Sequence, residues 1–173
     1  MNHNQEKQTE VTNTKKSDVF FIISNGTYQQ YERIIPYTDI NIDDEYDHYN
    51  LLQTAIAYEK KDIAMDLIER GINVNHRSSK RFTALHFCAM YNCNEIAESL
   101  VQRNAKVDYY DGYGNDPLWY AVGESNYKMA KLFVEHGANI NHKNKANLSP
   151  LDAAKDDNDL EMIKILTHYP ADE

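Results

Sequence analysis

Apolar and polar positions recur along this chain at one fixed interval. Each repeat has a leucine near its start, and small apolar residues follow it three and four positions later, as Cys88 and Ala89 follow Leu85. That spacing places the three side chains on one face of a helix. A second apolar stripe follows further along each repeat, for example at Ile96 and Leu100. The pattern therefore predicts two short amphipathic helices per repeat. The repeating leucines, which are equally spaced, are Leu52, Leu85, Leu118 and Leu151.

Turn residues follow the same period. Glycine or asparagine comes after each second helix in the middle of the chain, where a left-handed backbone is needed and these residues adopt it most readily. These positions are Gly71, Asn104 and Gly137. Asp116-Pro117 and Ser149-Pro150 each place an N-cap residue before a proline at the first helical position. In the second repeat, these limits predict helices over about residues 51–58 and 62–70.

The segment Thr83-Ala84-Leu85-His86 resembles the signature of the ankyrin repeat, and the interval between the leucines equals the period of that family. The resemblance extends from about Ser17 to the C-terminus. It implies an all-α solenoid of paired antiparallel helices, with projecting turns or β-hairpin fingers. Residues 1–16 are polar without periodicity and are predicted to form a flexible tail. The expected units are about 17–49, 50–82, 83–115, 116–148 and 149–173.

Charge and cysteine content narrow the classes of partner and compartment. The chain carries 27 acidic and 18 basic residues, for a net charge of −9, so direct binding to nucleic acid is disfavoured. A protein partner with basic patches would suit this charge. Two cysteines do not indicate a disulfide scaffold, which is typical of a reducing compartment. The one early apolar run, Val19 to Ile23, is too short for a signal peptide or a membrane span. We therefore expect a cytoplasmic protein.

No catalytic or cofactor site is predicted. By the resemblance, His86 has a structural role, in which it forms hydrogen bonds near the turn and holds neighbouring units in register. Gln53, Trp119 and Asp152 occupy its position in the other units, so no histidine recurs there. The chain has no phosphate-binding glycine loop and no nucleophile elbow. These observations argue against an enzyme.

A metal site is not predicted either. His86 and Cys88 are two positions apart on one helix and diverge, and with Cys93 they would still lack the fourth ligand of a zinc site. Five carboxylates lie within residues 39–47 but lack the spacing of a calcium loop. That stretch is either a solvated acidic loop or a contact for a basic partner.

The resemblance also implies where a partner would bind. Ankyrin repeats usually contact partners through the projecting turns and the exposed side of the first helices, which together form a concave face. Those positions here are rich in aromatic residues, which are enriched at interface cores. The candidate partner-binding residues are Tyr46, Asp47, Tyr49, Tyr58, Lys80, Phe82, Met90, Tyr91, Tyr113, Asn115, Trp119, Tyr120 and Glu124.

Several of these rings have a second interpretation, because they could pack between units. For Tyr49, Phe82 and Tyr120 the two interpretations stay open. For Tyr46, Tyr91 and Tyr113 contact with a partner is favoured. Trp119 replaces the histidine that is usual in the family, and it either fills a local gap or anchors a partner.

Three functions are compatible with these features. The first is a stand-alone inhibitor of one protein, such as the immunity partner of a basic, nuclease-like bacterial toxin; it is suggested by a small, acidic chain made almost wholly of repeats. The second is an adaptor or secreted effector that docks a host or cellular protein. The third, less favoured, is an enzyme with an unrecognised site. We expect a monomer that forms a heterodimer with one protein partner.

Overall fold

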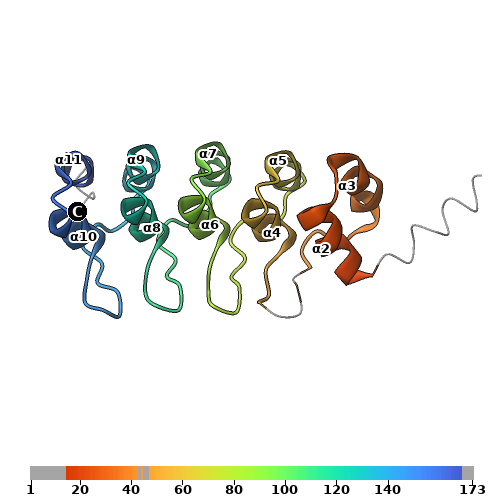
Figure 1. Cartoon of the computed structure of the whole chain (residues 1–173), viewed down its shortest axis with the longest axis horizontal. Coiled ribbons are helices and arrows are strands. Elements are labelled where there is room, and N and C mark those ends of the chain that lie inside the picture. Colours follow the sequence, from red (N-terminus) through yellow and green to blue (C-terminus); the bar gives the residue numbers. More distant parts are fainter. Residues whose placement is uncertain (1–14, 43, 45–46, 169–173) are drawn as a thin grey trace, which may run out of the picture.

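The computed structural model describes residues 15–42, 44 and 47–168. Over these residues, ten α-helices form two parallel rows, with a set of loops projecting below one row (Figure 1). We call the row next to the loops the inner helices and the other row the outer helices. The inner helices are α2 (Lys16–Asn25), α4 (Leu51–Ala57), α6 (Ala84–Met90), α8 (Pro117–Gly123) and α10 (Pro150–Asp156). The outer helices are α3 (Tyr28–Ile34), α5 (Lys61–Glu69), α7 (Asn94–Gln102), α9 (Tyr127–Glu135) and α11 (Leu160–His168), and a 3-10 turn, η1 (Ile35–Tyr37), follows α3.

Each inner helix packs against the outer helix that follows it and against the next inner helix, so the molecule is a linear stack of helix pairs. The predicted all-α repeat solenoid is confirmed. The helices agree with the predicted ranges to within one or two residues. Helix α2 begins at Lys16, one residue inside the segment predicted to be a tail. No helix in the described part of the chain is both long enough and apolar enough to cross a membrane.

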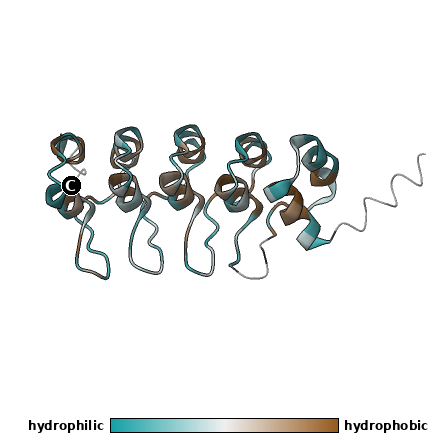
Figure 2. Ribbon diagram, in the orientation of Figure 1, coloured by the Kyte–Doolittle hydropathy of each residue, from teal (hydrophilic) through white to brown (hydrophobic). Residues whose placement is uncertain are grey.

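The repeating leucines form the centre of the core, with one exception. Leu52, Leu85 and Leu118 are fully buried between successive inner helices. Leu151, expected to be equivalent, is only half-buried. In a repeat stack each unit buries its apolar face against its neighbours, and α10 has a neighbouring inner helix on one side only within the described residues. Figure 2 shows apolar colour mainly in the helices and polar colour mainly along the projecting loops.

Left-handed residues end the second helices as predicted. The φ angles of Gly71, Asn104 and Gly137 are 84°, 61° and 86°. In each case the backbone turns back toward the stack directly after the outer helix. Because only glycine and asparagine adopt this conformation at low cost, these positions set where each outer helix stops.

One polar side chain at the third position of the inner helices connects the start of a unit to the finger residue at its end. The buried His86 accepts a hydrogen bond at Nδ1 from the Thr83 N–H at 3.1 Å, and its Nε2 lies 3.2 Å from the Asn115 backbone oxygen. In the preceding unit, Gln53 Nε2 donates to the Phe82 backbone oxygen at 2.8 Å. The hydrogen bonds of His86 therefore agree with the structural role predicted for this residue. Both links run nearly the length of one unit and reach its last residue, directly before the N-cap residue of the next inner helix.

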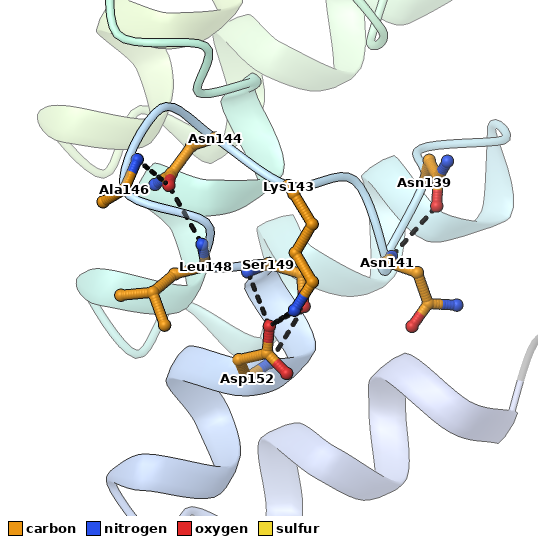
Figure 3. A network of polar contacts seen from close by, with 8 residues as sticks. All are labelled: Asn139, Asn141, Lys143, Asn144, Ala146, Leu148, Ser149 and Asp152. Carbon is orange, nitrogen blue, oxygen red and sulfur yellow. Dashed lines mark hydrogen bonds and ion pairs between the residues drawn. The ribbon is translucent and has the colours of Figure 1, made fainter.

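The projecting loops are tight turns, which we call fingers. One polar side chain organises each of them by accepting backbone N–H groups; in the fourth finger Asn144 Oδ1 accepts from Ala146 and Leu148 at 2.9 and 3.2 Å (Figure 3). The equivalent residues in the first three fingers are Asp44, Ser78 and Asp111. Single backbone hydrogen bonds join neighbouring fingers, as from Gly112 N–H to the Lys80 oxygen at 2.8 Å. The described residues of the fingers contain no strand, so they are turns rather than extended hairpins.

Candidate interaction surface

The fingers and the exposed side of the inner helices make one continuous surface, which we call the finger–helix face. Its continuity is shown by ring contacts between the two kinds of element. Phe82 of the second finger lies 6.0 Å from Phe87 of α6 and 6.1 Å from Tyr120 of α8, measured between ring centroids. Tyr49 of the first finger contacts Phe87 at 5.1 Å in an edge-to-face arrangement. Tyr91 stacks on Phe87 at 6.2 Å.

These five rings form an aromatic row that includes residues of four successive units. Edge-to-face pairs at such distances add about 0.5–1.5 kcal/mol beyond the area they bury, so the row is preorganised and stiff. Phe87 is its central member, although the sequence analysis did not name it as a candidate. Phe87 occupies the position in its repeat that Tyr120, which was a candidate, occupies in the next, and the repeat period could have identified it.

Hydrogen bonds inside the chain hold two candidate residues. The Tyr120 hydroxyl donates to Asp111 Oδ2 at 2.5 Å, and the Asn115 side chain donates to the Tyr120 hydroxyl at 3.4 Å. Burial, together with the bond to Asp111, raises the pKa of Tyr120 far above its ordinary value, so the phenol stays neutral. Tyr120 and Asn115 thus support the third finger against α8, and the half-buried ring of Tyr120 leaves one side open to solvent.

Three tyrosines on this face are exposed. The exposed fractions of Tyr58, Tyr91 and Tyr113 are 55%, 46% and 64%. Tyr58 and Tyr91 follow directly after α4 and α6 as their C-cap residues, and Tyr113 lies at the tip of the third finger. Each offers a large amphipathic ring with few rotatable bonds, which is the kind of side chain that interfaces favour.

The remaining candidates are dispersed over the same face. Lys80 is exposed on the second finger, Glu124 is exposed at the end of α8, and Met90 is half-buried in the last turn of α6. Asp47 is half-buried in the first finger, where its backbone oxygen accepts from Ser79 N–H at 2.8 Å. A further candidate, Tyr46, lies outside the described residues.

Trp119 differs from its equivalents His86 and Gln53. It is half-buried on α8, and its indole N–H has no hydrogen-bond acceptor among the residues that the structure describes. The hydrogen bond that His86 makes to the finger at the end of its unit is therefore missing at Trp119. Both interpretations of this residue, local filler or partner anchor, remain hypotheses.

Groups suspected of chemistry lie in structural positions. His86 is buried, and this burial lowers its pKa to about 4, so the ring is neutral near pH 7. Cys88 is fully buried and Cys93 half-buried, and burial raises the pKa of both thiols. Among the described residues, no three His, Cys, Asp or Glu side chains gather as a metal site would need. Within the acidic stretch 39–47, Asp44 accepts backbone N–H groups of its own finger, while Asp43 and Glu45 lie outside the described residues.

Comparison with known families agrees with this architecture. Residues 18–111 match a family model described as ankyrin repeats in three copies, and residues 113–145 match a model of the single ankyrin repeat. Together the two matches span well over half of the chain. No curated protein matches the chain.

Proposed function

The chain belongs to the ankyrin-repeat family, whose repeats form generally non-catalytic protein–protein interaction modules, and we propose that it binds and neutralises one protein partner through its finger–helix face. The observation that carries this proposal is the exposure of Tyr58, Tyr91 and Tyr113 on the face that also holds the aromatic row, of which Tyr91 is the exposed member. Exposed tyrosines above a rigid aromatic layer provide anchors that need little ordering on binding, which reduces the entropic cost of association.

The proposed partner is a basic protein, of which a nuclease-like bacterial toxin is our specific candidate. A net charge of −9 favours encounter with a positively charged surface and disfavours a nucleic-acid ligand. We expect a 1:1 complex of a monomer with its target, with about 800 Å² buried on each side. Inhibition would follow if the bound partner's active surface is covered.

The test has two parts. The product of a neighbouring gene is co-expressed with this chain and the complex is purified; growth of cells that express the neighbour is then measured with and without this chain. A stable complex and restored growth support an inhibitor. A complex without protection points to an adaptor, and the absence of any complex contradicts the proposal for that neighbour.

Substitution at the surface connects the complex to the finger–helix face. Replacing Tyr91 and Tyr113 by alanine should weaken the complex at least tenfold while the circular dichroism spectrum stays unchanged, because both rings are exposed and support little of the fold. The matched control replaces Tyr127, which is exposed on the outer helix α9 at 41%. Equal loss of affinity in the control would place the interface elsewhere.

A further inference from the structure

The finger–helix face is chemically different at its two ends. Tyr58, Tyr91, Glu124 and Asp157 follow one another at intervals of one repeat, and they are the C-cap residues of α4, α6, α8 and α10. Their backbone angles are similar, with φ between −109° and −81°, so the four side chains leave the stack from equivalent positions. Along this column the chemistry therefore changes from two phenols to two carboxylates.

The neighbouring column changes in the same direction. Ala57 and Met90 end α4 and α6, whereas Gly123 and Asp156 end α8 and α10. We call the part of the face on α4 and α6 the aromatic half and the part on α8 and α10 the acidic half. Their difference lies along the axis of the stack, which is the direction in which a long partner segment would lie.

The acidic half concentrates negative potential. Each helix C-terminus carries a partial negative charge from its free carbonyl groups, and a carboxylate placed there is unfavourable. Glu124, Asp156 and Asp157 all occupy such positions, and none has an ion-pair partner within the part of the chain that the structure describes. These three charges reduce the stability of the free protein, and a bound cation would relieve that cost.

Some carboxylates on the outer helices are paired. Glu95 pairs with Lys61 at 2.5 Å, and Glu98 pairs with Lys128 at 2.8 Å, each across neighbouring helices. Other exposed carboxylates of the outer helices have no ion-pair partner in the described chain, so the lack of an ion pair does not by itself select a face. The acidic half is distinguished by its position, because Glu124 and Asp157 continue the column that begins with Tyr58 and Tyr91.

Cations border the aromatic half. Lys80 and Arg81 are exposed on the second finger, beside Phe82 of the aromatic row. Exposed lysines also border the acidic half, at Lys145 on the fourth finger and Lys155 on α10. The two halves therefore differ in the side chains of the C-cap column, which are phenols in one and carboxylates in the other.

From this arrangement, and resting on the proposed function, we infer that the finger–helix face binds a partner segment in one direction, with an apolar or aromatic anchor on Tyr58 and Tyr91 and with lysine or arginine side chains on Glu124, Asp156 and Asp157. Packed helices lie about 8–10 Å apart, so the two subsites are separated by roughly 20 Å from α6 to α10. An extended chain spans that distance in about six residues.

The experiment uses the full chain as the target for a displayed library of random 16-residue peptides. The selected peptides should have apolar or aromatic residues at one end and lysine or arginine at the other, in a consistent order and about six residues apart. Three outcomes would overturn the inference. The selected peptides could be acidic, they could carry apolar and basic residues in no consistent order, or no peptide could be enriched. The proposed function is judged on the natural complex, so it can survive that outcome.

The contribution of each subsite is then measured with variants of this chain. Fluorescence anisotropy gives the affinity of each variant for the selected peptide that binds most tightly. Replacing Tyr58 and Tyr91 by serine should abolish measurable binding. The triple variant Glu124→Gln, Asp156→Asn, Asp157→Asn should weaken binding about tenfold at low salt and reduce its salt dependence, because three exposed ion pairs are lost.

A charge-matched control separates the acidic half from the general charge of the protein. Asp62→Asn, Glu69→Gln and Glu161→Gln remove three exposed carboxylates of outer helices that have no ion-pair partner in the described chain, and the net charge changes equally. Less than a twofold effect is expected. If both triple variants weaken the peptide equally, the attraction is not local and the inference is wrong.

Discussion

His86 Nε2 and the Asn115 backbone oxygen lie 3.2 Å apart, so one buried side chain connects helix α6 to the finger residue that directly precedes the next unit. The same link runs from Gln53 to the Phe82 oxygen at 2.8 Å, one repeat earlier. Imidazole and amide therefore serve one purpose, which is to satisfy a carbonyl at the base of the next finger. The neutral state of His86 is required for this role, and its burial maintains that state.

We expect His86→Gln to fold with little loss of stability, because Gln53 already performs the role in the preceding unit. His86→Ala should lose about 2–4 kcal/mol, since it leaves a cavity, removes the partner of the Thr83 N–H and takes one of two hydrogen bonds from the Asn115 oxygen. Urea denaturation followed by circular dichroism measures both. Equal losses in the two variants would show that packing, rather than hydrogen bonding, explains the role of His86.

The N-cap side chain of Asp116 is less well satisfied than the equivalent side chain of Asn50. It is buried, and although its Oδ1 accepts from Trp119 N–H at 2.8 Å, its Oδ2 has no partner within the described residues. Asn50, two repeats earlier, donates through its amide to the Asn73 oxygen at 3.2 Å. Asp116→Asn should therefore gain the equivalent bond and raise the unfolding free energy by about 1–3 kcal/mol at pH 7.5. Asp116→Ala, which loses the cap, is the control and should not be stabilised.

The pH dependence of stability follows from Asp116 and His86 together. Burial, reinforced by the charge of Asp111, raises the pKa of Asp116 from 3.8 to about 6. The protonated carboxyl therefore stabilises the folded state fully below pH 3.8, and this stabilisation is lost as pH rises through 6. Burial lowers the pKa of His86 from 6.5 to about 4, so its contribution is full above pH 6.5 and is lost as pH falls through 4. Each effect is on the order of 3 kcal/mol, and their signs oppose.

Single variants should separate these two effects. Asp116→Asn is expected to lose stability steadily from pH 6.5 to pH 4, because of these two groups only His86 then titrates. His86→Gln is expected to gain stability as pH falls from 6 to 3.8, relative to its value at pH 7. Chemical denaturation at half-unit steps of pH measures the profiles, and parallel profiles for the two variants would contradict both assignments.

Two glycines offer a matched comparison of backbone effects. A Cβ at Gly137 or at Gly123 would meet no atom within 4 Å, so neither substitution creates a clash. Gly137 has a φ of 86°, whereas Gly123 ends the helix α8. Gly137→Ala should lower the free energy of unfolding by about 1–2 kcal/mol, and Gly123→Ala should raise it by about 0.5–1 kcal/mol. The measurement is the midpoint temperature of thermal unfolding. A shift of the same sign in both variants would contradict the prediction.

Core burial predicts a difference between equivalent leucines. Leu85 is fully buried between α4 and α8, and Leu85→Ala should cost about 2–5 kcal/mol. Leu151 is half-buried at the end of the described stack, and Leu151→Ala should cost only about 1–2 kcal/mol. The unfolding free energy in urea is the measurement. A Leu151 variant as unstable as the Leu85 variant would mean that further chain covers α10.

Trp119→His tests whether this residue is an anchor. The introduced imidazole can reach the Leu148 oxygen as His86 reaches that of Asn115, so stability should rise by about 0.5–1.5 kcal/mol. Affinity for the partner isolated with this chain should fall by more than tenfold, because tryptophan is the residue most enriched among binding hot spots. Calorimetry gives the affinity. Unchanged affinity would identify Trp119 as local filler.

The sequence by itself determined the repeat architecture, the helix pairs and the left-handed turns, and the structural role of His86 was implied by the resemblance to the ankyrin repeat. This was possible because each unit contacts only its neighbours, so one strict period encodes the whole pattern of burial. For residues such as Leu85 and Gly137, the position within the repeat was enough to predict burial or a left-handed backbone.

Only the tertiary structure decided which side chains meet across units. It placed Phe87 at the centre of the aromatic row, connected the Tyr120 hydroxyl to Asp111, left one oxygen of Asp116 without a partner and exposed half of Leu151. These outcomes depend on distances between neighbouring helices and fingers and on where the stack ends. A linear period contains neither quantity, because it states which positions are equivalent and not which atoms come into contact.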